Sequence, residues 1–113
     1  MSEPDGRVHK GIGAAPGRMV GVAHVLSDTG DASDVPAGAV LVARLIHPYQ
    51  SPLFFRVGAV VTEEGGLLQH AAILAREFGV PAVLGVGNAT EIFRTGERLE
   101  VRGDTGEVIR LDD

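Results

Sequence analysis

The apolar positions of the chain fall into short runs that are separated by glycine, proline and polar residues. Side chains in residues 18–26 alternate between two faces, which predicts a strand. Continuous apolar runs rich in valine predict buried strands at residues 39–43, 57–62 and 81–86. Two further apolar runs near the end of the chain, at residues 99–102 and 107–111, flank a Gly-Asp-Thr-Gly turn and predict a terminal hairpin.

One long helical pattern covers residues 67–78 and stops before Gly79. At about 100° per residue, four apolar side chains form a single stripe on this helix. We expect the following residues to face the core: Ala71, Leu74, Ala75 and Phe78. His70 lies at the edge of that stripe, so we expect its side chain to be exposed.

The order of these elements predicts the fold class. A strand, the long helix and another strand follow one another around residues 57–86, which favours an α/β fold with a right-handed crossover in a mixed sheet. A shorter helix is predicted with Ser51 as its cap and Pro52 at its first position. We expect residues 1–10 to be a flexible N-terminal segment. Residues 11–113 are then one domain, as suits a chain of 113 residues.

Composition excludes several classes of function. The net charge is -5 with one lysine and no basic run, which argues against nucleic acid as a partner. There is no cysteine, so disulfides, thiolate catalysis and cysteine-based zinc sites are excluded. No histidine has a second ligand at metal-binding helical spacing, and we expect no metal site. No apolar stretch approaches the roughly 20 residues of a membrane span, and we expect a cytoplasmic protein without a membrane partner.

The candidate chemistry lies around His70. This histidine follows the glycine pair Gly65 and Gly66 and stands at the start of the long helix, where free N–H groups and the helix dipole favour an anionic phosphoryl group. Glycines allow close approach of another molecule. A neutral imidazole has a ring nitrogen that can attack phosphorus. The alternative for a lone histidine in this position is a surface residue or a helix cap.

The same stretch resembles the phosphohistidine signature of the mobile, swivelling domain of phosphoenolpyruvate-utilising enzymes. That family includes pyruvate phosphate dikinase, phosphoenolpyruvate synthase and rifampicin phosphotransferase. The match is ungapped and comprises Thr62, Gly65, Gly66, His70, Ala71, Ala72, Ile73, Ala75, Arg76, Glu77, Gly79, Pro81, Ala82 and Val83. The resemblance covers about residues 11–111. It implies a three-layer β/β/α swivelling domain that carries a phosphoryl group on His70, with Thr62, Gly65, Gly66 and Gln69 supporting the loop or the phosphate.

Two departures from the family pattern stand out. Leu68 and Gln69 replace the hydroxyl or thiol residues that usually precede the histidine. Gln69 either donates a hydrogen bond to a phosphoryl oxygen or lies in solvent, and the sequence does not decide between them. His47 replaces the usual aspartate before a proline, and we expect it to be a surface residue.

Three helix residues have weaker assignments. Ile73 is apolar but off the core stripe, so it contacts either a partner domain or the sheet. Arg76 points away from His70, which favours a structural ion pair or a partner contact over phosphate binding. Glu77 lies two turns from His70 and is expected to be solvated.

The resemblance implies a phosphoryl carrier that is inactive alone. Its partners in trans are then an ATP-grasp nucleotide-binding subunit and a substrate-binding subunit. Magnesium and ATP, or phosphoenolpyruvate, belong to those partners, and we expect no cofactor bound by this chain itself. The alternatives are a non-catalytic docking or regulatory module with the same fold, and an excised piece of a larger enzyme.

Overall fold

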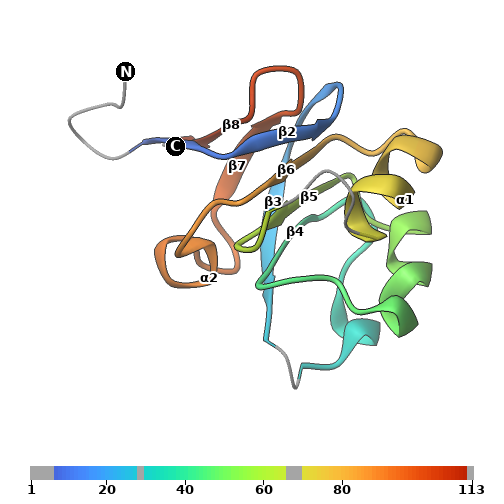
Figure 1. The fold of residues 1–113 in the computed structure, drawn as a ribbon. Helices are drawn as coiled ribbons and strands as arrows, with labels where there is room; N and C mark the ends of the chain where they lie inside the picture. Colours follow the sequence, from blue (N-terminus) through green and yellow to red (C-terminus); the bar gives the residue numbers. More distant parts are fainter. Residues whose placement is uncertain (1–6, 28–29, 66–69, 112–113) are drawn as a thin grey trace.

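The computed structural model describes residues 7–27, 30–65 and 70–111, which contain eight strands and four short helices (Figure 1). The strands are β1 (Val8–Lys10), β2 (Ile12–Ala15), β3 (Arg18–Leu26), β4 (Val40–Ala43), β5 (Ala59–Thr62), β6 (Ala82–Leu84), β7 (Arg98–Arg102) and β8 (Glu107–Leu111). The helices are α1 (His70–Phe78) and α2 (Ala89–Ile92), with two 3-10 helices, η1 (Ala32–Asp34) and η2 (Pro48–Phe55).

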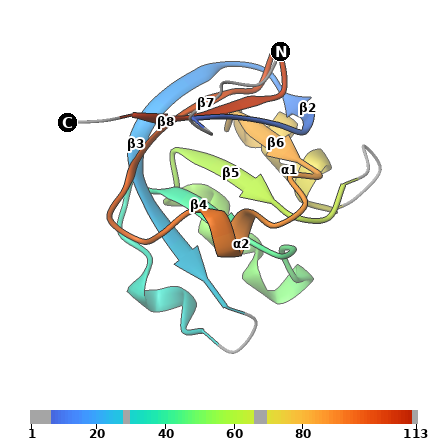
Figure 2. The same ribbon diagram turned by 90° about the vertical axis from the view of Figure 1, so that its left-hand side faces the viewer.

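All eight strands belong to one mixed sheet in the order β1-β8-β7-β3-β4-β5-β6-β2. The long strand β3 joins the two halves of this sheet (Figure 2). Its residues 18–22 pair antiparallel with β7, and its residues 23–26 pair parallel with β4. Strands β4, β5 and β6 are parallel to one another, while β2 adds an antiparallel edge. The predicted mixed sheet and the crossover between β5 and β6 are confirmed.

Alternate side chains of the parallel strands fill two cores, which makes the fold three-layered. Leu41 and Val60 point to the face covered by α1 and η2. Val40 and Val61 point to the opposite face, where they meet the strands of the antiparallel half. Figure 1 shows α1 and α2 on opposite sides of these strands. The predicted β/β/α layering is thereby confirmed.

The buried face of α1 is rotated from the predicted stripe. It consists of Ala71, Ala72 and Ala75, so it is centred on Ala75, and Leu74 is only partly buried at its margin. Phe78 was expected in the core, but 39% of it is exposed. Its ring instead contacts the ring of Phe55 edge-on, with 4.6 Å between centroids. Three alanines against the sheet bring the helix close, and this geometry leaves the larger side chains outside.

The N-terminal part is more ordered than the sequence suggested. Val8–Lys10, expected in a flexible segment, form β1 and pair with β8. Residues 12–15 form β2 and pair with β6. Glycine makes this pairing feasible, because a Cβ on Gly11, just before β2, would lie 2.3 Å from the carbonyl oxygen of Leu84 in β6. These two strands are the edges of the sheet, where they cover β8 and β6.

Helix η2 begins at Pro48 rather than at the predicted Pro52. Proline suits a first helical position because its missing N–H would have no partner there. The backbone N–H of His47, the preceding residue, is donated instead to the side-chain oxygen of the buried Gln50 at 2.8 Å. Ser51 therefore lies within the helix and does not cap it.

Candidate functional site

His70 is an exposed side chain at the start of α1, as predicted. The chain reaches it from the carboxyl end of β5, a strand with parallel neighbours on both sides. Crevices beyond the carboxyl ends of parallel strands are the usual place for functional groups in open α/β sheets.

Ser51 of η2 holds the imidazole ring. The Ser51 hydroxyl oxygen lies 2.9 Å from Nε2 of His70 and 2.6 Å from the carbonyl oxygen of Pro48. A carbonyl oxygen can only accept, so the single hydroxyl proton is donated to Pro48. The hydroxyl oxygen then accepts from Nε2–H of His70. In the neutral ring this arrangement favours the proton on Nε2 and the lone pair on Nδ1.

This tautomer has a chemical consequence. Nδ1 can attack an electrophile from the resting arrangement. Attack by Nε2 requires His70 to give up the Ser51 contact and to shift its proton to Nδ1.

Ser51 is the site residue that sequence analysis missed. It is 19 residues from His70 in the chain. The Ser-Pro pair at residues 51–52 resembles a helix start, and this local pattern concealed the role. The signal that identifies Ser51 is tertiary, since η2 packs beside α1 (Figure 1).

Thr62 anchors the base of the loop that leads to His70. It is fully buried, and its hydroxyl donates to the carbonyl oxygen of Glu64 at 2.6 Å. Backbone bonds from Gly85 to Glu64 and from Val86 to Thr62 tie the same segment to the chain after β6. The role of Thr62 in the structure is thus loop support.

Gly65 makes a close contact inside the domain. A Cβ at this position would lie 3.0 Å from Cα of Gly85, so a side chain here would force the two segments apart. The sequence suggested that the glycine pair admits another molecule, whereas at Gly65 the close neighbour is Gly85. Gly66 and Gln69, the other two residues assigned to phosphate or loop support, lie outside the described residues, as does Leu68.

The charged side chains near this loop bond within the domain. Arg44 pairs with Glu64 at 2.5 Å. Glu63 accepts from the backbone N–H of Thr90 at 2.9 Å and so caps the start of α2. Arg76 donates to the carbonyl oxygen of Ala14 at 2.8 Å, which ties α1 to β2.

The remaining predicted residues of α1 are exposed. Ile73 is 48% exposed, and Glu77 is also exposed. His47, expected at the surface, is half-buried and stacks on Tyr49, with 5.3 Å between ring centroids. Histidines and carboxylates of the described ranges nowhere gather into a group of three that could hold a metal ion. The helices of the described ranges are too short or too polar to cross a membrane.

Residues 35–106 match the sequence profile of the family described as "PEP-utilising enzyme, mobile domain". The chain belongs to this family. The mobile domain is 44% identical over 105 residues to the rifampicin phosphotransferase of Streptomyces sviceus, a match that covers 93% of this chain and 12% of that protein. It is 42% identical over 101 residues to the probable phosphoenolpyruvate synthase of Staphylothermus marinus, covering 88% of this chain and 12% of that protein.

Solved structures share the fold of this chain. The solution structure of an Enzyme I protein superimposes with a TM-score of 0.63 at 34% identity, over 74% of this mobile domain and 34% of that chain. The holo-form of Thermococcus kodakaraensis aconitase X has a TM-score of 0.74 at 21% identity, over 95% of this chain and 100% of that chain, and so shares the fold. The mobile domain spans only about an eighth of the length of the curated relatives. His70, Ser51 and Thr62 all lie within the matched residues.

Proposed function

We propose that this mobile domain is a phosphoryl carrier that accepts a phosphoryl group on His70 and delivers it to an acceptor at a second site. The observation that supports this proposal most strongly is the setting of His70. It is exposed at the start of α1, it is fixed by Ser51, and it lies in the residues that match the family.

The chemistry proceeds in two displacements. A ring nitrogen of His70 attacks the phosphorus of ATP or phosphoenolpyruvate, and the bond from phosphorus to the leaving oxygen breaks. In the second step an oxygen of the acceptor attacks the same phosphorus. The N–P bond then breaks, and its electrons return to the ring.

The proposal assigns the donor and acceptor sites to other protein domains. The three arginines Arg44, Arg56 and Arg76 bond to a carboxylate or to backbone carbonyls of this domain. Charge on the transferring phosphoryl group is therefore neutralised by the first turn of α1 and by magnesium in the partner's site. An ATP-grasp nucleotide-binding unit and a substrate unit are the partners, and the reaction takes place in the cytoplasm.

The test follows a labelled phosphoryl group onto the chain and off again. The chain is mixed with labelled ATP or phosphoenolpyruvate and magnesium, with and without full-length S. sviceus rifampicin phosphotransferase as the phosphoryl donor. We expect no turnover by the chain alone, and labelling only when the donor protein is present.

The labelled chain is then isolated and mixed with unlabelled donor protein and the nucleotide product of the loading step. Loss of the label supports a carrier. A wild-type chain that is never labelled indicates a docking module instead. His70→Ala tests whether the label depends on His70, and His24→Ala is its matched control: a carrier loses the label in the first variant and keeps it in the second.

A further inference from the structure

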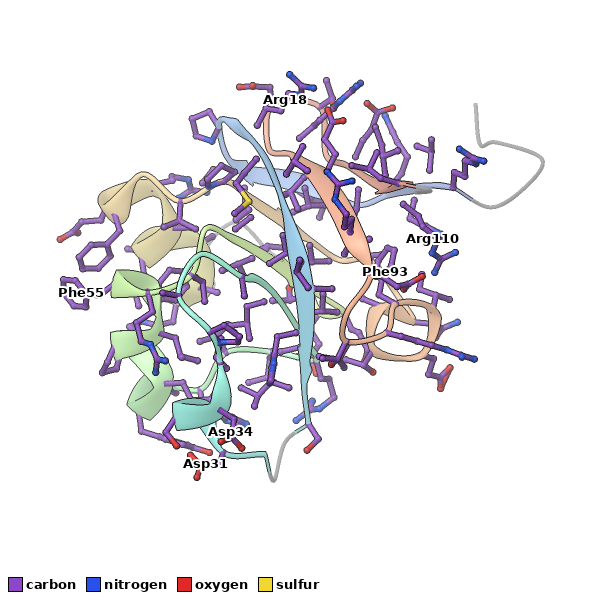
Figure 3. The ribbon with its side chains drawn as sticks, turned by 180° about the vertical axis from the view of Figure 1, so that it is seen from behind. Arg18, Asp31, Asp34, Phe55, Phe93 and Arg110 are labelled. Carbon is purple, nitrogen blue, oxygen red and sulfur yellow. The ribbon has the colours of Figure 1, made fainter. Side chains whose placement is uncertain are left out.

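Exposed apolar side chains gather on η2 beside α1. In a 3-10 helix, residues three apart lie above one another. Tyr49, Pro52 and Phe55 have this spacing, and all three are exposed, Tyr49 by 74% and Phe55 by 75%. Figure 3 shows Phe55 at the outer edge of the molecule. The stripe faces away from the buried side of η2, where Leu53 and Phe54 enter the core.

One exposed side chain of α1 continues this surface. The ring of Phe78 contacts the ring of Phe55. The aromatic rings of Tyr49, Phe55 and Phe78 account for three of the five aromatic residues in the whole sequence. We call these four residues the aromatic surface: Tyr49, Pro52, Phe55 and Phe78.

The aromatic surface adjoins His70. Ser51, which holds the imidazole ring, is in the same helix as Tyr49, Pro52 and Phe55, and its 2.9 Å contact joins the two helices at one end of this surface. The edge contact between Phe55 and Phe78 joins them at the other end.

We propose that the aromatic surface is the docking surface for the catalytic domain that loads the phosphoryl group onto His70. This inference rests on the proposed function. It also rests on the length of the relatives, in which about seven-eighths of the chain lies outside the matched region and is available as a partner. Large exposed apolar side chains that adjoin one another mark protein contacts in soluble proteins. A second copy of this chain seated here would cover His70 and block the transfer.

The chemistry of the surface defines the partner. Its side chains are uncharged, and aromatic residues are frequent anchors in the buried centre of interfaces. The donor domain therefore presents an apolar groove, and docking depends little on salt. Docking through an electrostatic contact would weaken as the salt concentration rises.

The test compares loading of His70 by two phosphoryl donors. Full-length S. sviceus rifampicin phosphotransferase with ATP and magnesium is the protein donor. Phosphoramidate, a small molecule that phosphorylates histidine directly, needs no docking. The variants are Phe55→Ser and Phe78→Ser. Val22→Ser is the matched control, because Val22 is 51% exposed but lies on β3, where it pairs with β7.

We expect both phenylalanine variants to raise the half-saturating concentration of this chain by about tenfold or more, with kcat nearly unchanged. Val22→Ser should load like wild type, and phosphoramidate should label all variants equally. Equal loading of every variant by the protein donor overturns the docking surface and leaves the carrier function intact. A wild-type dimer that Phe55→Ser converts to a monomer assigns the surface to a second copy and also overturns it. Wild type that accepts phosphate from phosphoramidate but not from the protein donor refutes the proposed function, and the docking surface with it.

Discussion

Replacing Ser51 with alanine weakens the preference of the His70 proton for Nε2. The hydroxyl oxygen of Ser51 accepts from Nε2–H at 2.9 Å, and an alanine methyl group cannot accept. A typical hydrogen bond contributes about 0.5–1.5 kcal/mol net. Since RT is about 0.6 kcal/mol, losing this bond lowers the ratio of the Nε2–H to the Nδ1–H tautomer by roughly 2- to 12-fold. The site is exposed, so we expect the lower half of that range.

The tautomer ratio is read from two-bond proton–nitrogen NMR correlations of the imidazole at a pH where the ring is neutral. Ser33→Ala is the matched control, because the Ser33 hydroxyl bonds to Asp31 on η1 and does not contact His70. We expect wild type and Ser33→Ala to give the same ratio, with Nε2–H predominant. A predominant Nδ1–H form in wild type, or an unchanged ratio in Ser51→Ala, would refute the assignment of the hydroxyl proton to Pro48.

Two further predictions concern stability. Phe93→Ala should lower the free energy of unfolding by about 3–5 kcal/mol, because Phe93 is 1% exposed. Phe78→Ala should cost less, because 39% of Phe78 is already exposed in the folded state. Urea melts compare the two variants, and equal losses would contradict the observed burial. The Arg18 side chain, and then that of Arg102, hold the pKa of the buried Glu100 carboxyl below its usual value. A lowered pKa stabilises the fold above the unfolded value near 4.3, and this contribution is lost as pH falls through the folded value. Wild type should therefore lose stability in acid relative to Glu100→Gln. Parallel curves of unfolding midpoint against pH would show that the ionised Glu100 carboxylate does not stabilise the fold.

Much of the fold could be predicted because its signals are local. The valine-rich runs became β4, β5 and β6, and the glycine-flanked hairpin became β7 and β8. The N-terminal strands could not be predicted in the same way. Residues 12–15 contain glycine and two alanines and have little strand propensity, so their pairing with β6 depends on the close approach of Gly11 to Leu84, which no local pattern reveals.

The residues of the candidate site were predicted only where their signals are local in the sequence. His70 and its exposure follow from a contiguous motif and a helix projection. The projection placed Phe78 in the core because it gave every apolar residue equal weight, but the sheet selects the three alanines that permit close packing. The contact between Ser51 and His70 joins segments 19 residues apart, and only the packing of η2 on α1 brings them together.

The central claim is that His70 alone carries the phosphoryl group, and mapping the label tests it most directly. The chain is loaded by the S. sviceus enzyme, and the bound phosphate is located by mass spectrometry under conditions that preserve phosphohistidine, in wild type, His70→Ala, His24→Ala and His47→Ala. We predict a base-stable, acid-labile label on His70 in wild type and in the two control variants, and no label on His70→Ala. A label that persists in His70→Ala, or that maps to His9, His24 or His47, would contradict the carrier mechanism.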